Sequence, residues 1–295
     1  MNGFIILDKP EGITSFIAAG IVKRAAGVKK AGHTGTLDPM ATGVLPVAVG
    51  HATRFIDFLP DCDKAYRASF RLGETTDTLD ITGKTLTVSD NIPNENYVTS
   101  LFPKFTGEIL QLPPMYSAIR IDGRRLYDLA RRGIDVEREK RKVAIYYIEY
   151  ISHEGNEYTI EVKCSKGTYI RSLISDIGEC AGCGAVMTSL KRILSNGFSL
   201  EDAHSGQEIK NAANSGLLED FLIPVDAALK AYPEVYVSQG QAKRFSNGGG
   251  LSGGRLHMNL EGSLYRVYSD GGKFLGLGEY DPDLSELKVK RVFVE

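Results

Sequence analysis

Residues 32–55 read GHTGTLDPMATGVLPVAVGHATRF, and the interpretation of the whole chain starts from this stretch. It joins a glycine-broken loop, a single carboxylate at Asp38 and an apolar run over 44–49 that predicts a buried strand. Pro39 disfavours the helical region for Asp38 and favours an extended backbone there. The chain can turn sharply and approach another molecule closely at Gly32, Gly35 and Gly43. Taken alone, an Asp-Pro step is typical of a simple turn, so the spacing does not by itself identify a catalytic acid.

Length and composition describe a globular protein with enough chain for one large domain and one small one. The 295 residues carry a formal net charge of −2, so the chain as a whole is not a basic nucleic-acid binder. Any such contact must come from local patches. The amino terminus, MNGFIILDKPEG, has no basic leader, and no stretch approaches the roughly 18 apolar residues of a membrane span. With four cysteines and no leader, we expect reduced thiols in the cytoplasm and no membrane partner.

Hydrophobic periodicity predicts a mixture of helices and strands, which agrees with the α+β fold implied by the family resemblance given below but does not establish it. Strands are predicted over 3–7, 44–49, 64–72, 143–151, 158–164, 235–237, 264–268, 274–277 and 287–294. Helices are predicted over 14–26, 52–59, 97–105, 168–179 and 205–222. The composition shifts near Tyr232, and the strands beyond it indicate a small β-barrel-like module.

Several segments resemble one known family, in the same order along the chain. GHTGTLDPMATGVLPV is similar to the signature loop of the TruB family of tRNA pseudouridine synthases, and YRASFRLGETTDTLD and CSKGTYIRSLISDIG resemble further motifs of that family. The resemblance implies a mixed, largely antiparallel sheet with flanking helices in a catalytic domain over 1–230, and a PUA-like RNA-binding domain over 231–295. It implies that the partner is tRNA, and that the reaction isomerises the uridine at position 55 of the T loop to pseudouridine after the base is flipped out.

The resemblance also implies roles for individual residues. Asp38 is the implied nucleophile, Arg171 its partner, and Tyr66 the implied group for the final proton abstraction at carbon 5. The residues implied to hold the extruded uridine are His33, Tyr66, Tyr169, Leu190, Lys9 and Arg192. Lys191 stands at the middle position of the family's Leu-Arg-Arg motif, which leaves the role of that position open. Without the family resemblance, His33 is more typical of a hydrogen-bonded loop residue, Tyr66 of strand packing and Arg171 of a surface residue.

Two basic segments are candidates for contact with the RNA backbone. Residues 120–142 hold nine Lys or Arg and five Asp or Glu, a local excess of +4. An apolar helical centre there is surrounded by Arg124, Arg125, Arg131 and Arg132. The alternatives are a solvated amphipathic helix and a mobile clamp that grips phosphates, and the resemblance to an RNA-gripping insertion favours the clamp. In the C-terminal module, Lys243 and Arg244 are the corresponding candidates.

The implied isomerisation requires no oxidation, so we expect no cofactor. One ionised carboxylate suffices as nucleophile, and the sequence does not choose between attack on the ribose anomeric carbon and attack on the uracil ring. We expect no metal: Asp77 and Asp80 stand in a Thr-rich turn and are interpreted as turn-formers, and Cys180 and Cys183 as packing thiols.

Two alternatives to the synthase stay open at this point. One is a tRNA-binding folding helper in which catalysis is incidental or absent. The other is a metal-dependent hydrolase that uses Asp38, Asp57, Asp77 and a nearby histidine, whose spacing matches no known ligand set. We expect a monomer, because no heptad or long apolar stripe is present.

Overall fold

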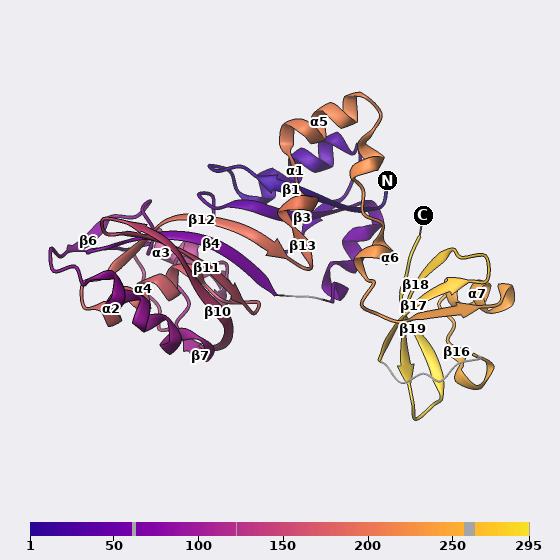
Figure 1. Cartoon of the computed structure of the whole chain (residues 1–295). Coiled ribbons are helices and arrows are strands. Elements are labelled where there is room, and N and C mark those ends of the chain that lie inside the picture. The colour runs from indigo at the N-terminus through magenta and orange to yellow at the C-terminus, as the bar shows by residue number, and fades with distance from the viewer. Residues whose placement is uncertain (61–62, 122, 257–262, 295) are drawn as a thin grey trace. The chain divides into compact units, whose positions relative to one another are not determined.

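The computed structural model describes residues 1–60, 63–121, 123–256 and 263–294, with the backbone alone at Arg125. The chain divides into two compact units (Figure 1). Unit 1 consists of Met1–Pro39, Val44–Asp61 and Leu200–Glu295, and unit 2 of Met40–Gly43 and Cys62–Ser199. Both units combine helices with strands, and the strands pair in parallel and in antiparallel fashion. The predicted α+β class with a mixed sheet is confirmed.

The first part of unit 1 packs two helices on a small group of strands. β1 (Gly3–Lys9) lies between β3 (Thr42–Val49) and β14 (His204–Ser205), and β2 (Ala31–His33) pairs with β3. α1 (Ser15–Ala25) and α5 (Gly206–Asn214) lie next to each other (Figure 1). Their apolar sides share one core with the strands, formed by residues such as Leu7, Val22, Val47 and Ile209. The helix predicted over 14–26 is confirmed, and Thr14 caps it by accepting a hydrogen bond from the Ile17 amide.

Two helices predicted in unit 1 are shorter or of a different type. The segment over 52–59 forms a 3-10 helix, η1 (Gly50–Phe58), instead of an α-helix. The Asn2 side chain accepts the His51 amide, and the Thr53 hydroxyl donates to the Gly50 carbonyl, so local bonds favour the tighter turn. The helix predicted over 205–222 stops at Asn214, and the short pieces η4 (Leu218–Phe221) and α6 (Val225–Ala228) follow it.

The C-terminal part of unit 1 is a five-stranded curled sheet with one helix. Its strands follow the order β15 (Glu234–Val237), β17 (Leu264–Ser269), β18 (Phe274–Asp281), β19 (Glu286–Val292) and β16 (Leu251–Ser252). The four strands predicted after Tyr232 are confirmed. The sequence reading missed α7 (Gln239–Ser246), which begins with a capping box between Ser238 and Gln241. η5 (Gly253–Arg255) completes this part, and its core includes Phe245, Val267 and Leu287.

Unit 2 is built on a sheet of long antiparallel strands. β12 (Ala185–Ser195) pairs with β4 (Lys64–Leu72), which pairs with β11 (Glu157–Cys164), followed by β10 (Arg141–Glu154) and β7 (Gly107–Gln111). The strands predicted over 143–151 and 158–164 are confirmed as β10 and β11, and they form a hairpin with Gly155 and Asn156 as its turn. β13 (Phe198–Ser199) and the start of β3 also pair with β12. Gly43 has a φ of +97°, and a Cβ there would collide with the Arg192 carbonyl, so only glycine permits this pairing.

Helices cover part of this sheet, and the connections carry short elements. α4 (Ile170–Ala181) packs on β12 and β4, and α2 (Glu95–Leu101) packs on α4 and continues into η2 (Phe102–Phe105). The connections of unit 2 contain two short hairpins. One pairs β5 with β6 (Glu74–Thr76, Thr85–Val88), and the other pairs β8 with β9 (Arg120–Ile121, Arg124–Arg125). η3 (Leu200–Asp202) in unit 1 follows β13 directly in the chain. Among the described residues, no helix is long and apolar enough to cross a membrane.

The cysteines are only partly the packing thiols that the sequence suggested. Cys164, Cys180 and Cys183 are free thiols. Cys183 is buried, and burial raises the pKa of its thiol, as it raises the pKa of the Cys164 thiol to about 11. Cys180 is exposed, so the packing interpretation is wrong for that residue.

Candidate functional site

Asp38 lies in the loop between β2 and β3, and the segment that joins β1 to α1 fixes this loop on both sides of it. The buried hydroxyl of Ser15 accepts a hydrogen bond from the Leu37 amide at 2.8 Å and donates to the Leu37 carbonyl at 3.1 Å. The Gly12 amide donates to the Pro39 carbonyl at 2.8 Å. The backbone before and after Asp38 is therefore held, while the residue itself is partly exposed.

Lys9, at the end of β1, also contacts this loop. Its side chain is fully buried, and its ammonium group donates to the carbonyls of Pro39 at 3.1 Å and Pro10 at 2.9 Å. Burying a lysine ammonium group costs free energy unless such acceptors replace water. The two contacts therefore indicate that Lys9 helps to hold the backbone of the loop. Its assignment to substrate binding stays a prediction. His33, at the end of β2 opposite Val47, is partly buried in the same unit.

Unit 2 brings together three of the predicted residues on one face of its sheet. In the β4–β12 register, Tyr66 lies opposite Arg192, and Leu190 lies opposite Ala68. Because alternate residues share a face, Tyr66, Leu190 and Arg192 point to the same side. Arg192 is fully buried and is hydrogen-bonded through its side chain to Tyr66. Burial lowers the pKa of Arg192, and the contact with Tyr66 opposes that effect.

Arg171 lies in the first turn of α4 and is buried, whereas an arginine there would ordinarily be on the surface. It donates to the carbonyls of Thr78 at 2.9 Å and Tyr116 at 2.8 Å. Its Nη1 is 3.7 Å from Oδ2 of Asp80, which is also buried. The guanidinium group is therefore held rigidly by two chain segments that are distant in sequence.

Asp80 is the turn-former that the sequence suggested, and it has a second partner that the sequence reading missed. Its Oδ1 accepts hydrogen bonds from the Thr82 amide at 3.0 Å and from the hydroxyls of Thr78 and Thr82 at 2.8 and 2.5 Å. Its Oδ2 faces Arg171. Among the described residues, no group of three or more His, Cys, Asp or Glu is placed to hold a metal ion.

A buried glutamine that the sequence reading also missed fixes Tyr169. The Gln111 side chain donates to the Tyr169 carbonyl at 3.0 Å and accepts from its amide at 2.8 Å. In the first turn of α4, the Ser172 hydroxyl donates to the Leu112 carbonyl at 2.9 Å. The end of β7 thus sets the position of Tyr169, which is the N-cap residue of α4. A glutamine at the end of a strand gives no local signal of such a contact.

The basic insertion differs in part from its predicted form. Its helical centre is confirmed over α3 (Leu126–Ala130), where Leu126 and Leu129 are buried, but the β8–β9 hairpin precedes it. Three of the predicted arginines expose their side chains to solvent, namely Arg124, Arg131 and Arg132. The Arg131 guanidinium carbon is 5.6 Å from the centre of the Tyr127 ring. The side chain of Arg125 lies outside the described part of the chain.

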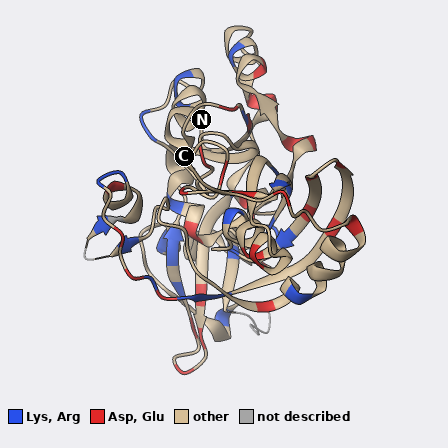
Figure 2. Ribbon diagram, turned by 90° about the vertical axis from the view of Figure 1, so that its left-hand side faces the viewer, with Lys and Arg blue, Asp and Glu red and all other residues tan. Residues whose placement is uncertain are grey.

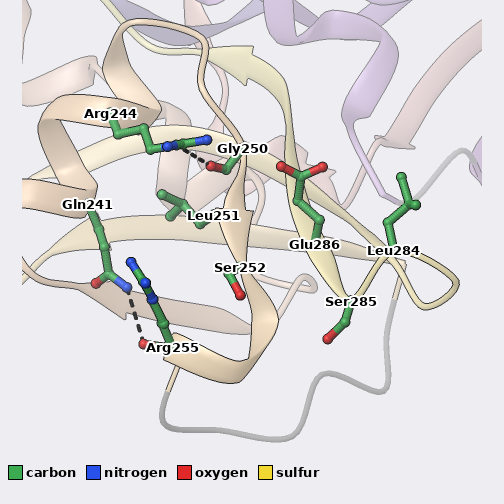
Figure 3. Close-up of a pocket in the computed structure, with 9 residues that line it drawn as sticks. All are labelled: Gln241, Arg244, Gly250, Leu251, Ser252, Arg255, Leu284, Ser285 and Glu286. Atoms are coloured by element: carbon green, nitrogen blue, oxygen red, sulfur yellow. Dashed lines mark hydrogen bonds between the residues drawn. The ribbon is translucent and has the colours of Figure 1, made fainter.

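The C-terminal part of unit 1 carries a cavity beside the other predicted basic pair. Lys243 and Arg244 are exposed on α7, and Arg244 lines a cavity of about 210 Å³ together with Arg255 and Glu286 (Figure 3). The Arg244 Nε donates to the Gly250 carbonyl at 2.6 Å, which fixes the guanidinium group at the rim. Lys, Arg, Asp and Glu are distributed over much of the ribbon (Figure 2).

Three family profiles match the chain. They are described as "TruB family pseudouridylate synthase (N terminal domain)" over residues 23–170, "tRNA pseudouridylate synthase B C-terminal domain" over 171–230, and "Pseudouridine synthase II TruB, C-terminal" over 233–293. The chain is 43% identical over 295 residues to tRNA pseudouridine synthase B of Clostridium kluyveri, with 100% of both chains covered. It is 38% identical over 304 residues to the protein of that name from Escherichia coli O1:K1 / APEC, covering 100% of this chain and 96% of the relative.

Solved structures give the same picture at the level of the fold. A chain of an H/ACA ribonucleoprotein bound to a substrate RNA that contains 2'-deoxyuridine is similar with a TM-score of 0.74 and 26% identity, covering 99% of this chain and 85% of that one. A chain of a Cbf5–Nop10–Gar1 complex has a TM-score of 0.74 and 28% identity, with the same coverage of 99% and 85%.

Proposed function

Because the chain belongs to the TruB family of pseudouridylate synthases, an enzyme family that isomerises uridine to pseudouridine in tRNA, we propose that its target is the T-loop uridine at position 55. The uridine is flipped out of its stack, and Asp38 acts as nucleophile on it. The single observation that carries this proposal is the fixed loop around Asp38, in which Lys9, Gly12 and Ser15 hold the backbone while Asp38 is partly exposed.

The reaction is an isomerisation that needs no second substrate. The bond between uracil N1 and the ribose anomeric carbon breaks, the base turns over, and a bond forms between uracil C5 and the same carbon. The C5 proton leaves, and N1 gains a proton. Asp38 supplies the nucleophile for the first step, either at the ribose or at the uracil ring, and leaves again in the last. A backbone held in place before the substrate binds reduces the ordering required in the transition state.

We assign the removal of the C5 proton to Tyr66, with Arg192 as its partner. A phenol oxygen must carry negative charge to accept a proton, and a buried guanidinium hydrogen-bonded to it stabilises that charge. Leu190 shares this face and supplies apolar surface to the base.

The further site residues follow the family pattern. Arg171 is assigned as the partner of the nucleophile from the family pattern alone, and Asp80 and two carbonyls hold its guanidinium group. Tyr169 orients the uracil, and the Gln111 contacts that fix its backbone support this role. His33 fills the space that the extruded base vacates.

We propose the domain organisation that the family implies. Residues 1–230 form the catalytic domain, with the insertion over 120–142 as an RNA clamp, and residues 231–295 form a PUA-like domain. The profile boundary between 230 and 233 and the separate core around Phe245 support this division. Exposed arginines support backbone contacts in the clamp, and the cavity beside α7 supports them in the PUA-like domain. We propose a cytoplasmic monomer, the location following from the tRNA substrate.

The test uses unmodified tRNA that carries tritium at uridine C5. Wild type should release the label, with one pseudouridine per tRNA mapping to position 55, and Asp38→Asn should not release it. Release from another position would contradict the T-loop assignment, and release by Asp38→Asn would contradict the nucleophile. Tight binding of tRNA without any release by wild type would favour the folding-helper alternative. A requirement for added metal would favour the hydrolase alternative.

A further inference from the structure

We propose that the exposed face of α1 and the loop after it form a further tRNA-binding surface, with one base on Phe16 and phosphates on the cations behind it. This inference rests on the proposed function. The surface, called the α1 surface, is defined by Phe16, Gly20, Lys23, Arg24, Lys29 and Lys30.

An aromatic side chain at the start of α1 is exposed to an unusual degree. Phe16 has 83% of its surface exposed, and the neighbouring Ile17 has 50%. An aromatic side chain stabilises a fold mainly when it is buried, so folding alone does not explain an aromatic residue at this exposed position. An exposed ring beside a catalytic loop is the kind of group on which an unpaired base stacks, because every base has a flat apolar face.

Helical geometry aligns this ring with two cations. At 100° per residue, positions 16, 20, 23 and 24 lie on one side of α1. The buried residues Ser15, Ala18, Ala19 and Val22 lie on the other. Phe16 and Lys23 are separated by roughly 10 Å along the axis, which matches about three stacked nucleotides.

Gly20 lies between the aromatic and the basic end, and the protein itself does not require it. A Cβ at this position would meet only the Arg24 guanidinium, at 3.9 Å, and Gly20 has no positive φ. A mid-helix glycine destabilises a helix relative to alanine by roughly 1 kcal/mol. A glycine on the exposed side is explained by the close approach of a partner, here an RNA strand between Phe16 and Arg24.

The charge of this segment fits a polyanion. Residues 12–37 contain four Lys or Arg and no Asp or Glu, on a chain whose net charge is −2. All four cations, Lys23, Arg24, Lys29 and Lys30, are exposed. Within the described part of the chain, none of them forms an ion pair with an acidic side chain. Such a local excess of unpaired positive charge favours phosphate over a protein or an apolar partner.

The α1 surface is continuous with the loop of Asp38. Ser15, the neighbour of Phe16, is hydrogen-bonded to the backbone of Leu37, the neighbour of Asp38. Summing the bonds along this path places the Phe16 and Asp38 Cα atoms at most about 15 Å apart. At roughly 3.4 Å per stacked base, Phe16 lies within about four nucleotides of a base at Asp38. The occupant is therefore the same tRNA.

The test measures binding of unmodified tRNA by fluorescence anisotropy over a range of salt concentrations, so it does not depend on turnover. Phe16→Ala should weaken Kd about tenfold without changing the salt dependence. The variant with Lys23, Arg24, Lys29 and Lys30 all replaced by alanine should weaken Kd more at low salt. It should also reduce the slope of log K against log salt by about 1 for each lost phosphate contact. In turnover experiments, KM should rise by a similar factor to Kd.

Gly20→Leu separates binding from folding. Leucine favours the helix, so Tm should stay the same or rise by roughly 1–3 °C, while Kd weakens at least as much as in Phe16→Ala. Matched controls are Leu217→Ala, an exposed leucine outside α1, and Lys230→Ala, an exposed lysine outside the basic segment; both should bind like wild type.

The α1 surface would be overturned if all three variants had the wild-type Kd and salt slope. It would also be overturned if only the variant without the four cations bound more weakly, because that result would show a general electrostatic attraction and no specific contact at Phe16. If wild type binds tRNA with these effects but releases no tritium, the proposed function fails and the surface stands.

Discussion

The loop of Asp38 in unit 1 and the start of α4 in unit 2 hold their functional side chains by opposite physical means. Around Asp38, neutral groups and one lysine hold the backbone, and the residue itself is partly exposed. At Arg171, the charged group itself is buried and is bonded to two carbonyls and faced by Asp80. In the first arrangement, residues other than the proposed nucleophile hold the backbone of the loop. The second makes the functional group part of the core, so stability and activity depend on the same atoms.

The largest effect expected from this difference is at Asp38. Asp38→Asn should reduce tritium release by on the order of 10⁴-fold or more, because it removes the nucleophile. Its free energy of unfolding should change far less in proportion than its activity, since Lys9, Gly12 and Ser15 hold the backbone of the loop. The measurements are single-turnover kinetics and urea unfolding. A loss of stability above about 1 kcal/mol would show that the carboxylate also holds the loop, and would remove the contrast with Arg171.

Arg171→Met should instead lose both properties. The change leaves the buried Asp80 carboxylate without its cation and two carbonyls without a donor, so unfolding should become easier by about 3 kcal/mol. Activity should be lost at temperatures where the variant is still folded. Asp80→Asn is the matched control, because the amide oxygen can still accept the Thr82 amide bond. It should cost less stability than Arg171→Met, which also removes the donor to two carbonyls, and an equal cost would mean that the ion pair alone accounts for the loss.

Ser15→Ala tests whether the loop of Asp38 depends on one hydroxyl. The change leaves the buried Leu37 amide and carbonyl without their partner, which should cost about 1–2 kcal/mol in unfolding free energy. Activity should fall roughly tenfold, because a looser loop places the nucleophile less well. Thr14→Ala, which removes only the cap of α1, should cost similar stability with little loss of activity. If both variants lose activity equally, α1 as a whole, and not the Ser15 contact, positions Asp38.

The same contrast explains what the sequence predicted and what it missed. Strands such as β4 and β11 follow from their alternation, and α1 follows from Thr14 and the apolar spacing after it. α7 was missed because its KRFSNGG segment lacks a strong apolar period and runs into glycines. The signature residues were found because the family keeps them in short local motifs.

The residues that hold the site have no local signature. Gln111 contacts Tyr169 across 58 residues of chain, and Ser15 contacts Leu37 across 22. A buried glutamine or serine reads as an exposed one until the fold brings its partner near. Sequence reasoning therefore identified groups that face the substrate, and missed those that face the protein.

The smallest expected effect concerns Asp176, a half-buried carboxylate on α4. Burial, and then repulsion from Glu179, raises the pKa of Asp176 to about 6, although Lys140 acts against them. In the unfolded chain this carboxyl loses its proton near pH 4, so folding is penalised increasingly from about pH 4 to 6 and fully above that. Asp176→Asn should thus stabilise the protein at pH 7 by about 1 kcal/mol, allowing for partial exposure, and by nothing below about pH 4. Urea unfolding at several pH values measures this, with the exposed Asp220→Asn as a control that should show no such dependence. A gain that is the same at pH 4 and pH 7 would show that helix propensity, and not the charge of Asp176, is the cause. Asp176 would then no longer serve as an example of an unpaired charge on α4 to set against Arg171, which faces a carboxylate.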